Sequence, residues 1–132
     1  MSSLPLRIYY EDTDFSGFVY HARYLHFFER GRTEALREIG IDQRTLFEAE
    51  GGPESFVVRR MSIEFIQPAR MDDMVEVETT VRSLGAASIE MRQRLIREGS
   101  VLAEADVTIA FLAGGRPKRM SAMMRTALAA LQ

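Results

Sequence analysis

YHARYLHFFERGRTEALREIG, residues 20–40, carries apolar side chains at the spacing of an α-helix. These side chains recur every three or four positions, so they form one broad stripe along a helix that begins at Tyr20. The stripe consists of Tyr24, Leu25, Phe27, Phe28, Gly31, Ala35, Leu36 and Ile39. Gly40 follows the stripe and is a typical C-terminal cap. Because the stripe covers more than half of the circumference, we expect the rest of the protein to surround this helix almost completely.

A different apolar pattern begins after Gly51-Gly52-Pro53. Apolar and polar residues alternate there, which is typical of strands that are buried on one face only. The alternating segments are residues 61–65, 75–81, 89–95 and 101–111. Turn residues separate them, for example Ser83-Leu84-Gly85 and Glu98-Gly99-Ser100. The second half of the chain therefore predicts four antiparallel strands.

Three shorter elements complete the expected secondary structure. Residues 4–10 are apolar and aromatic and predict a first strand, which the turn residues of 12–17 follow. Residues 42–50 predict a short second helix. Ser121 predicts the N-cap of a last helix. The apolar side of that helix would consist of Met123, Met124, Ala127, Leu128 and Leu131.

This order of elements predicts an α+β fold in a single domain, residues 1–132. The fold is an antiparallel sheet of about five strands that curves around the long helix. One sheet with one main helix leaves its edge strands without partners, and a second copy of the chain would pair with such an edge. We therefore expect a two-fold dimer.

Composition excludes several classes of protein. The chain has 132 residues, is 46% hydrophobic and 27% charged, and has a formal net charge of -2. These values suit one soluble domain with one core, and they provide no broad basic surface for nucleic acid. No apolar run is longer than five residues, so we expect no membrane insertion, and the absence of a signal-peptide pattern favours the cytoplasm. The chain has no cysteine, which excludes disulfides, thiolate nucleophiles and cysteine metal sites.

The familiar motifs for serine hydrolysis and nucleotide binding are absent. The chain contains no G-x-S-x-G and neither of the common glycine-rich phosphate-binding loops. Its two histidines, His21 and His26, are five positions apart, which separates them by about 140° around a helix. Because this separation prevents them from sharing a metal ion, we expect no metal site.

Polar and aromatic residues gather just before the long helix. Tyr10, Asp14, Gly17 and His21 lie where the first strand passes through a turn into the helix. The first N–H groups of a helix have no partner within it and carry partial positive charge, so they suit a developing oxyanion. A carboxylate held nearby would act on a carbonyl compound as a base or a nucleophile.

Two simpler interpretations compete with this one. Asp12 or Asp14 stabilises the start of the helix, and the histidine makes only a surface hydrogen bond. We assign Asp12 and Glu11 to such a structural role, because their spacing from Asp14 does not suit a shared catalytic one. Further along the helix, Glu29 and Arg32 are interpreted as an i,i+3 pair or a dimer contact.

The segment YYEDTDFSGFVYHARYLHFFERGRTEALR, residues 9–37, resembles the hotdog-fold acyl-CoA thioesterases of the 4-hydroxybenzoyl-CoA thioesterase family. The specific signal is the combination of Y-x-x-T-D, G-x-V-Y-H and Y-L-x-F-F-E. The resemblance continues in FVVRRMSIEFIQPARMDDMVEVET, residues 56–79, and more weakly in GRPKR, residues 115–119. It extends from Leu6 to the region of Phe111, and it is closest to the branch associated with the bacterial Tol–Pal cell-envelope system.

The resemblance implies a hotdog fold, in which a curved antiparallel sheet wraps around a long central helix and a dimer continues the sheet. It implies that Asp14 is the catalytic aspartate and that Tyr10 and His21 belong to the site. The backbone N–H at or close to His21 would polarise the thioester carbonyl. Substrate contacts are expected at Gly17, Val19 and Tyr20. The glycine would let the backbone approach the substrate closely.

One position departs from the family. Relatives commonly carry alanine where this chain has Gly31. Glycine within a helix costs roughly 0.5–1 kcal/mol, and we expect closer packing of the helix against a neighbouring segment to offset that cost.

The activity that the resemblance implies is hydrolysis of an acyl-CoA thioester to a free acid and coenzyme A, with Asp14 as base or nucleophile. No cofactor is expected, because a thioester is already an activated acyl group. The alternative function is binding or scaffolding in the Tol–Pal system with little turnover. A hydroxyacyl dehydratase is a third option, but its histidine–glutamate motif is not found here. The expected partners are acyl-CoA, further copies of the chain in a homodimer or homotetramer, and proteins of the cell envelope or of lipid synthesis.

Coenzyme A carries phosphates, so basic side chains are expected along its path. The principal candidates are Arg59 and Arg60. The others are Arg92, Arg94, Arg116, Lys118 and Arg119. For each of them a merely solvated side chain is the simpler interpretation. The depth of the acyl pocket is expected to depend on Phe56, Val57 and Met61.

Overall fold

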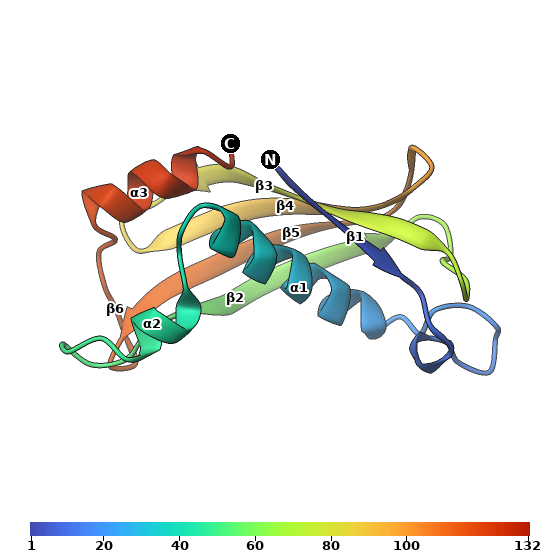
Figure 1. Ribbon diagram of the computed structural model, residues 1–132, viewed down its shortest axis with the longest axis horizontal. Coiled ribbons are helices and arrows are strands. Elements are labelled where there is room, and N and C mark those ends of the chain that lie inside the picture. The colour runs from blue at the N-terminus through green and yellow to red at the C-terminus, as the bar shows by residue number, and fades with distance from the viewer.

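The structure, a computed structural model, describes the whole chain, residues 1–132. A first strand leads through a 3₁₀ turn into two helices, and further strands precede a last helix. The elements in chain order are β1 (Ser2–Arg7), η1 (Tyr10–Asp12), α1 (Arg23–Glu38), α2 (Gln43–Phe47), β2 (Glu54–Phe65), β3 (Met74–Leu84), β4 (Ser88–Arg97), β5 (Ser100–Ala113), β6 (Arg116–Pro117) and α3 (Ala122–Ala129). The long helix lies across one face of the strands (Figure 1).

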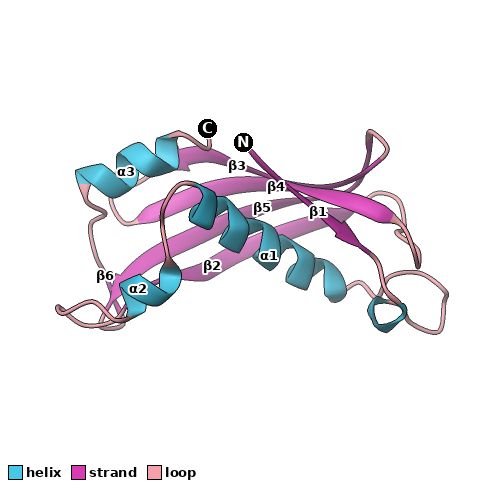
Figure 2. Ribbon diagram, viewed as in Figure 1, coloured by secondary structure: helices cyan, strands magenta, loops and turns pink.

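The five long strands form one antiparallel sheet in the order β1-β3-β4-β5-β2. The short β6 pairs with β5 beside this path. Strands make up one layer, which twists and curves, and the helices lie against it (Figure 2). The predicted α+β architecture is therefore confirmed. The edges of the sheet are β1 and β2.

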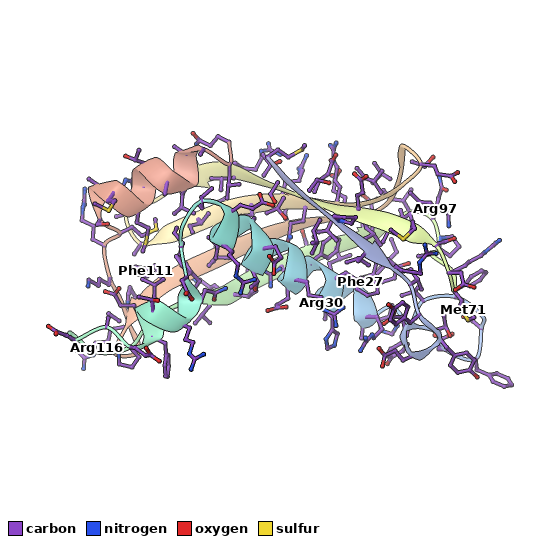
Figure 3. The ribbon with its side chains drawn as sticks, in the orientation of Figure 1. Phe27, Arg30, Met71, Arg97, Phe111 and Arg116 are labelled. Atoms are coloured by element: carbon purple, nitrogen blue, oxygen red, sulfur yellow. The ribbon has the colours of Figure 1, made fainter.

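The apolar face of α1 packs on β1, β3 and β4. Its buried residues are Tyr24, Phe27, Phe28, Gly31, Ala35 and Leu36. Phe27 lies where the helix crosses the sheet (Figure 3). The strands supply every second residue to the same core, as with Val75, Val77 and Val81 of β3. The alternation in the sequence is thus the signature of one buried sheet face.

Close approach of α1 to the sheet explains Gly31. A Cβ atom added there would collide with Val77 Cγ1 and would lie 3.1 Å from Gln93 Nε2 and 3.2 Å from Thr79 Oγ1. The buried Gln93 amide donates hydrogen bonds to Phe28 O and to Thr79 Oγ1, both at 2.9 Å. The predicted close packing at this glycine is confirmed.

Two element boundaries in the segment that leads into α1 differ from the sequence prediction. β1 ends at Arg7, so Tyr10 begins η1 instead of ending a strand. α1 begins at Arg23 rather than Tyr20. The reason is that the Tyr20 N–H donates to Asp12 O at 2.8 Å and closes a loop before the helix. An apolar pattern carries no information about such long-range backbone partners, so the sequence prediction placed the end of β1 too late and the start of α1 too early.

The expectation that the protein surrounds α1 is wrong. Leu25 belongs to the apolar stripe but is 46% exposed. A single sheet covers only one side of a helix, so the stripe is wider than the contact. In α3, Met123 is likewise 84% exposed, whereas Leu128 in this helix and Leu131 just after it are buried as predicted.

The predicted helix caps are confirmed. At the end of α1, the N–H groups of Gly40 and Ile41 donate to Arg37 O at 3.1 Å and Leu36 O at 2.9 Å, which is a Schellman motif. Gly40 has the positive φ of 85° that this motif requires. The Ser121 hydroxyl accepts a hydrogen bond at 3.1 Å from the third residue of α3. The short helix expected within residues 42–50 is α2.

Candidate active site

A tight loop between η1 and α1 carries Asp14 at its tip. Thr13 and Val19 face one another as an isolated antiparallel bridge. Inside this bridge the Asp14 N–H donates to Phe18 O at 3.0 Å, and the Gly17 N–H donates to Asp14 O at 3.1 Å. Gly17 has a φ of 87°, a backbone conformation that favours glycine. The turn itself therefore requires this residue.

The carboxyl group of Asp14 is exposed and is held by one neighbour. Its Oδ1 accepts hydrogen bonds from the Ser16 hydroxyl and, at 2.8 Å, from the Ser16 N–H. These two bonds, the hydroxyl first, lower the pKa of Asp14 below its usual value, and His21 adds a smaller effect in the same direction. The carboxylate is therefore ionised at neutral pH. Its Oδ2 accepts no hydrogen bond from the protein.

Asp14 and His21 line the same open pocket, of about 320 Å³. The loop, the start of α1 and the end of β2 with the segment after it form its walls. The lining residues are Asp14, Ser16, Phe18, Val19, His21, Tyr24, Phe65, Ile66, Gln67 and Pro68. Apolar walls with a few polar groups are usual for a site that binds a small ligand.

Aromatic rings form the wall beside His21. The Phe65 ring lies edge-on to His21 and to Tyr24, with centroid distances of 6.4 Å and 5.1 Å. Tyr24 is 4% exposed, and its hydroxyl accepts a hydrogen bond from the Ala69 N–H at 3.1 Å. Burial raises the pKa of Tyr24, so the phenol stays protonated at neutral pH. This wall is aromatic and lies next to the polar side of the pocket.

Two backbone N–H groups at the start of α1 are free. The N–H groups of the first three helical residues, Arg23 to Leu25, donate to the carbonyls of Tyr20, His21 and Ala22. The N–H groups of His21 and Ala22 themselves donate to no protein acceptor. The unpaired donors expected at the helix start therefore lie just before it, and one of the two residues that carry them, His21, lines the pocket.

Asp12 has a different environment from Asp14. It is 4% exposed, and its carboxylate forms an ion pair with Arg23 at 2.7 Å. It also accepts a hydrogen bond from the Tyr9 N–H at 2.8 Å. These contacts agree with the structural role expected for Asp12. Glu11 is exposed in η1.

The other expected site residues are only partly brought together. Val19 is buried and lines the pocket. Tyr20 contacts His21 edge-on, with ring centroids 4.7 Å apart. Tyr10 is 80% exposed and does not line the pocket of this chain.

The basic candidates for coenzyme A lie in several places. Arg59 and Arg60 are exposed on β2 and form no ion pair. Arg92 pairs with Asp106 and Arg94 with Glu104 on the outer face of the sheet. Lys118 pairs with Glu54. Arg116 lies at the end of the molecule opposite the start of α1 (Figure 3), and Arg119 is exposed near it in sequence.

The interpretation of Glu29 and Arg32 as a helix ion pair is wrong. Arg32 Nη1 donates instead to the buried Gln93 Oε1 at 3.0 Å. Glu29 accepts a hydrogen bond from the Thr33 hydroxyl at 3.1 Å. The reason is that Arg32 points toward the sheet, where desolvation lowers its pKa.

Several pocket residues are missing from the sequence prediction. Ser16 is two positions after Asp14, the usual spacing for a serine that bonds a turn aspartate, so the sequence carried a signal for it. Phe65 and Gln67 come from a distant strand end and gave no local signal. Of the residues expected to shape the acyl pocket, Phe56 lines a separate hollow with α1 residues. Val57 and Met61 do not line the Asp14 pocket.

No group of three or more histidine, cysteine, aspartate or glutamate side chains is placed to hold a metal ion. None of the helices has both the length and the apolar character needed to cross a bilayer.

The arrangement suits attack on a carbonyl group. An ionised carboxylate with a free oxygen and a histidine face one open pocket, and this histidine and its neighbour Ala22 carry free backbone N–H groups. Residues 16–104 match the model of the thioesterase superfamily. The chain belongs to this superfamily. The family-level resemblance of the sequence is therefore confirmed.

Curated relatives within the superfamily are close in sequence. The chain is 47% identical over 116 residues to the Haemophilus influenzae protein named acyl-CoA thioesterase YbgC. The aligned region covers 88% of this chain and 84% of the relative. It is 44% identical over 106 residues to the Escherichia coli protein named acyl-CoA thioester hydrolase YbgC, covering 80% and 77%.

Solved structures share the fold. A probable thioesterase from Bartonella henselae is 43% identical with a TM-score of 0.87, covering 91% of this chain and 98% of that one. A Thermus thermophilus thioesterase, solved with coenzyme A and zinc, is 27% identical with a TM-score of 0.84, covering 98% and 92%. The expected hotdog fold is confirmed.

Proposed function

We propose that this protein hydrolyses acyl-CoA thioesters to free acids and coenzyme A. The observation that carries the proposal is the pocket that Asp14 and His21 line together, where His21 and its neighbour Ala22 carry free backbone N–H groups. Membership of the thioesterase superfamily and the names of the YbgC relatives support the same activity.

In the proposed reaction the thioester carbonyl oxygen accepts hydrogen bonds from the free N–H groups, which hold the negative charge as it develops. Asp14 then acts by one of two routes. As a base it takes a proton from water, hydroxide adds to the carbonyl carbon, the C–S bond breaks, and the thiolate takes the proton. As a nucleophile its free oxygen attacks the carbonyl carbon, the thiolate leaves, and water hydrolyses the mixed anhydride.

The proposal assigns supporting roles to five further residues. His21 orients the water or assists departure of the thiol, since it shares the pocket with Asp14. Val19 and Tyr20 contact the substrate, and Gly17 gives the loop its turn. Tyr10 is exposed, so its role in positioning Asp14 or the acyl group requires a contact that the bound substrate or a second subunit supplies. The reaction needs no cofactor, because the thioester is already activated.

The proposal includes a homodimer or homotetramer located in the cytoplasm. The exposed edge strand β2 favours pairing between copies. Cell fractionation tests the location, and a protein found outside the cytoplasmic fraction would contradict it. The resemblance to the Tol–Pal branch favours a second candidate function, binding to proteins of the cell envelope or of lipid synthesis with little turnover.

A substrate panel tests the proposal. Acyl-CoA esters from acetyl to palmitoyl, and benzoyl-CoA, are incubated with the protein, and free thiol is measured. Release of thiol from at least one ester is the expected result. A folded protein that releases no thiol from any of them would favour the binding role, and formation of an enoyl product would indicate a dehydratase.

A further inference from the structure

Asp12 is the only charged residue among the buried residues of this chain. Its two carboxylate oxygens have different partners. Oδ1 accepts from Arg23 Nη2 at 2.7 Å and from Arg23 Nε at 3.0 Å. Oδ2 accepts from the Tyr9 N–H at 2.8 Å. A buried charge is unfavourable unless it is paired and hydrogen-bonded, so these contacts hold a defined geometry.

The backbone of Asp12 closes the base of the catalytic loop, residues 12–20. Its carbonyl accepts from the Tyr20 N–H at 2.8 Å, and its N–H donates to Tyr9 O at 3.0 Å. One residue thus joins the segment before the loop, the last residue of the loop and, through Arg23, the first residue of α1.

The start of α1 has no capping side chain of its own. Its N-cap, Ala22, makes no side-chain capping bond, and the first turn contains no acidic residue. Arg23 instead places a positive charge at the positive end of the helix dipole, which is unfavourable. The Asp12 carboxylate supplies the missing negative charge at this position.

The carboxylate of Asp14 makes no hydrogen bond or ion pair with α1. The side chain of Asp14 accepts hydrogen bonds only from Ser16, and its backbone bonds only to Gly17 and Phe18. All three partners lie inside the loop. Its place relative to the helix start therefore depends on how the base of the loop is fixed.

We propose that Asp12 is a positioning residue whose pair with Arg23 sets the Asp14 carboxylate against the free N–H groups before α1. This inference rests on the proposed thioesterase function. Asp12 does not touch the substrate; it fixes the distance between the attacking group and the oxyanion donors. Small misplacement of a reacting group lowers the rate of the chemical step more than it weakens binding.

Asparagine at position 12 tests the role because it keeps the shape of the side chain. Both oxygens of Asp12 accept hydrogen bonds, whereas an amide has one accepting oxygen and would turn its NH₂ toward Arg23 or toward the Tyr9 N–H. Asp12→Asn should lower kcat by about 10- to 100-fold, with little change in KM. Arg23→Gln should act in the same direction from the other side of the pair.

Glu104→Gln is the matched control. Glu104 is a partly buried acid on β5 that pairs with Arg94 at 2.8 Å, on the outer face of the sheet. Its loss removes an ion pair without touching the loop, so kcat should stay near that of the parent protein.

A double-mutant cycle between Asp12 and Asp14 separates positioning from general stability. Kinetics are measured below the unfolding transition of each variant, with far-UV circular dichroism as the check of folding. If Asp12 acts through Asp14, Asp12→Asn lowers kcat in the parent but changes the residual rate of Asp14→Asn by less than about twofold. If Asp12→Asn fails to fold, the same cycle is run with Arg23→Gln.

Each outcome decides the proposal. Unchanged kcat in a folded Asp12→Asn variant overturns it. An equal loss of rate on Asp12→Asn substitution in the parent protein and in Asp14→Asn also overturns it, and so does a loss of kcat in Glu104→Gln as large as that in Asp12→Asn. These results leave the proposed function intact if Asp14→Asn is inactive. If Asp14→Asn itself keeps normal turnover, the role of Asp14 in the proposed function fails, and the positioning role fails with it.

Discussion

Asp12 and Asp14 are two positions apart and have opposite environments. The first is 4% exposed and is paired with Arg23, whereas the second presents an exposed carboxylate to an open pocket. A buried paired acid contributes to structure, and an exposed acid with a free oxygen is available for reaction. Position along the loop, and not residue type, separates the two roles.

Replacement of Asp14 tests the catalytic assignment directly. Asparagine keeps the acceptor for Ser16 but neither takes up a proton nor attacks as a carboxylate. Asp14→Asn should lower kcat by roughly 10²–10⁴, the usual scale for loss of a positioned acid–base group. The melting temperature should change little, because the carboxyl is exposed. Glu11→Gln, an exposed acid in η1, is the control, and near-normal turnover of Asp14→Asn would show that Asp14 is not catalytic.

Ser16 should set the acid limb of the pH profile. Its hydroxyl is the main cause of the lowered pKa of Asp14. The ionised carboxylate is the active form, so kcat/KM falls as the pH drops through this pKa. Ser16→Ala raises the pKa toward its usual value, and the acid limb should move to higher pH. An acid limb at the same pH in both proteins would contradict this, and Ser62→Ala, on β2, is the control.

At the scale of elements, the contact between α1 and the sheet depends on a missing side chain. Gly31→Ala gains about 1 kcal/mol of helix propensity. The new methyl group collides with Val77 Cγ1, a branched side chain in a strand that has few alternative rotamers. Overpacking of this kind costs about 1–3 kcal/mol, so we expect a net loss of unfolding free energy.

Urea denaturation measures the effect of Gly31→Ala. The Val77→Ala substitution in the same chain should remove the collision, so the two changes together should be less destabilising than the sum of the two alone. Additive effects would mean that the methyl group finds space elsewhere.

Two exposed arginines on β2 are the proposed contacts for the phosphates of coenzyme A. Arg59 lies at the bulge between Val58 and Arg60, and both arginines are exposed. If they attract coenzyme A, then Arg59→Ala and Arg60→Ala should raise KM, and so should added salt, because the Debye length is only about 10 Å at 0.1 M. Arg82→Ala, an exposed arginine on β3, is the control. A KM that is insensitive to salt and to both substitutions would contradict the assignment.

At the scale of the whole molecule, the two sheet edges are unequal. β1 has 6 residues and contains Pro5, which has no N–H to donate. β2 has 12 residues, and Val57 and Val58 on it are each 43% exposed. A long apolar edge is the one that pairs with another chain. The structure thus points to β2 for the dimer that the sequence predicts.

Light scattering at micromolar concentration tests this dimer. We expect twice the chain mass of 15.0 kDa, or four times for a tetramer. Val58→Lys should shift the protein toward the monomer, because an edge lysine opposes pairing. Ser3→Lys, on the β1 edge, should leave the mass unchanged. A stable monomer in the parent protein would refute the dimer, and dissociation by Ser3→Lys alone would assign it to β1.

The sequence by itself determined the elements and the neighbourhood of the candidate site. Helical spacing around Phe27 and Phe28 and alternation in the strands are local patterns, so they predicted the α+β fold and most element positions. Asp14 and His21 stand seven positions apart across one turn, so their meeting in one pocket followed from the loop and from the family resemblance.

Only the tertiary structure decided which side chains are buried and what they meet. Four features depend on contacts between separate segments of the chain. They are the pairing of Asp12 with Arg23, the start of α1 at Arg23, the lack of space for a methyl group at Gly31, and the place of Phe65 beside His21. Burial and desolvation arise from packing between such segments, and local periodicity carries no information about that packing.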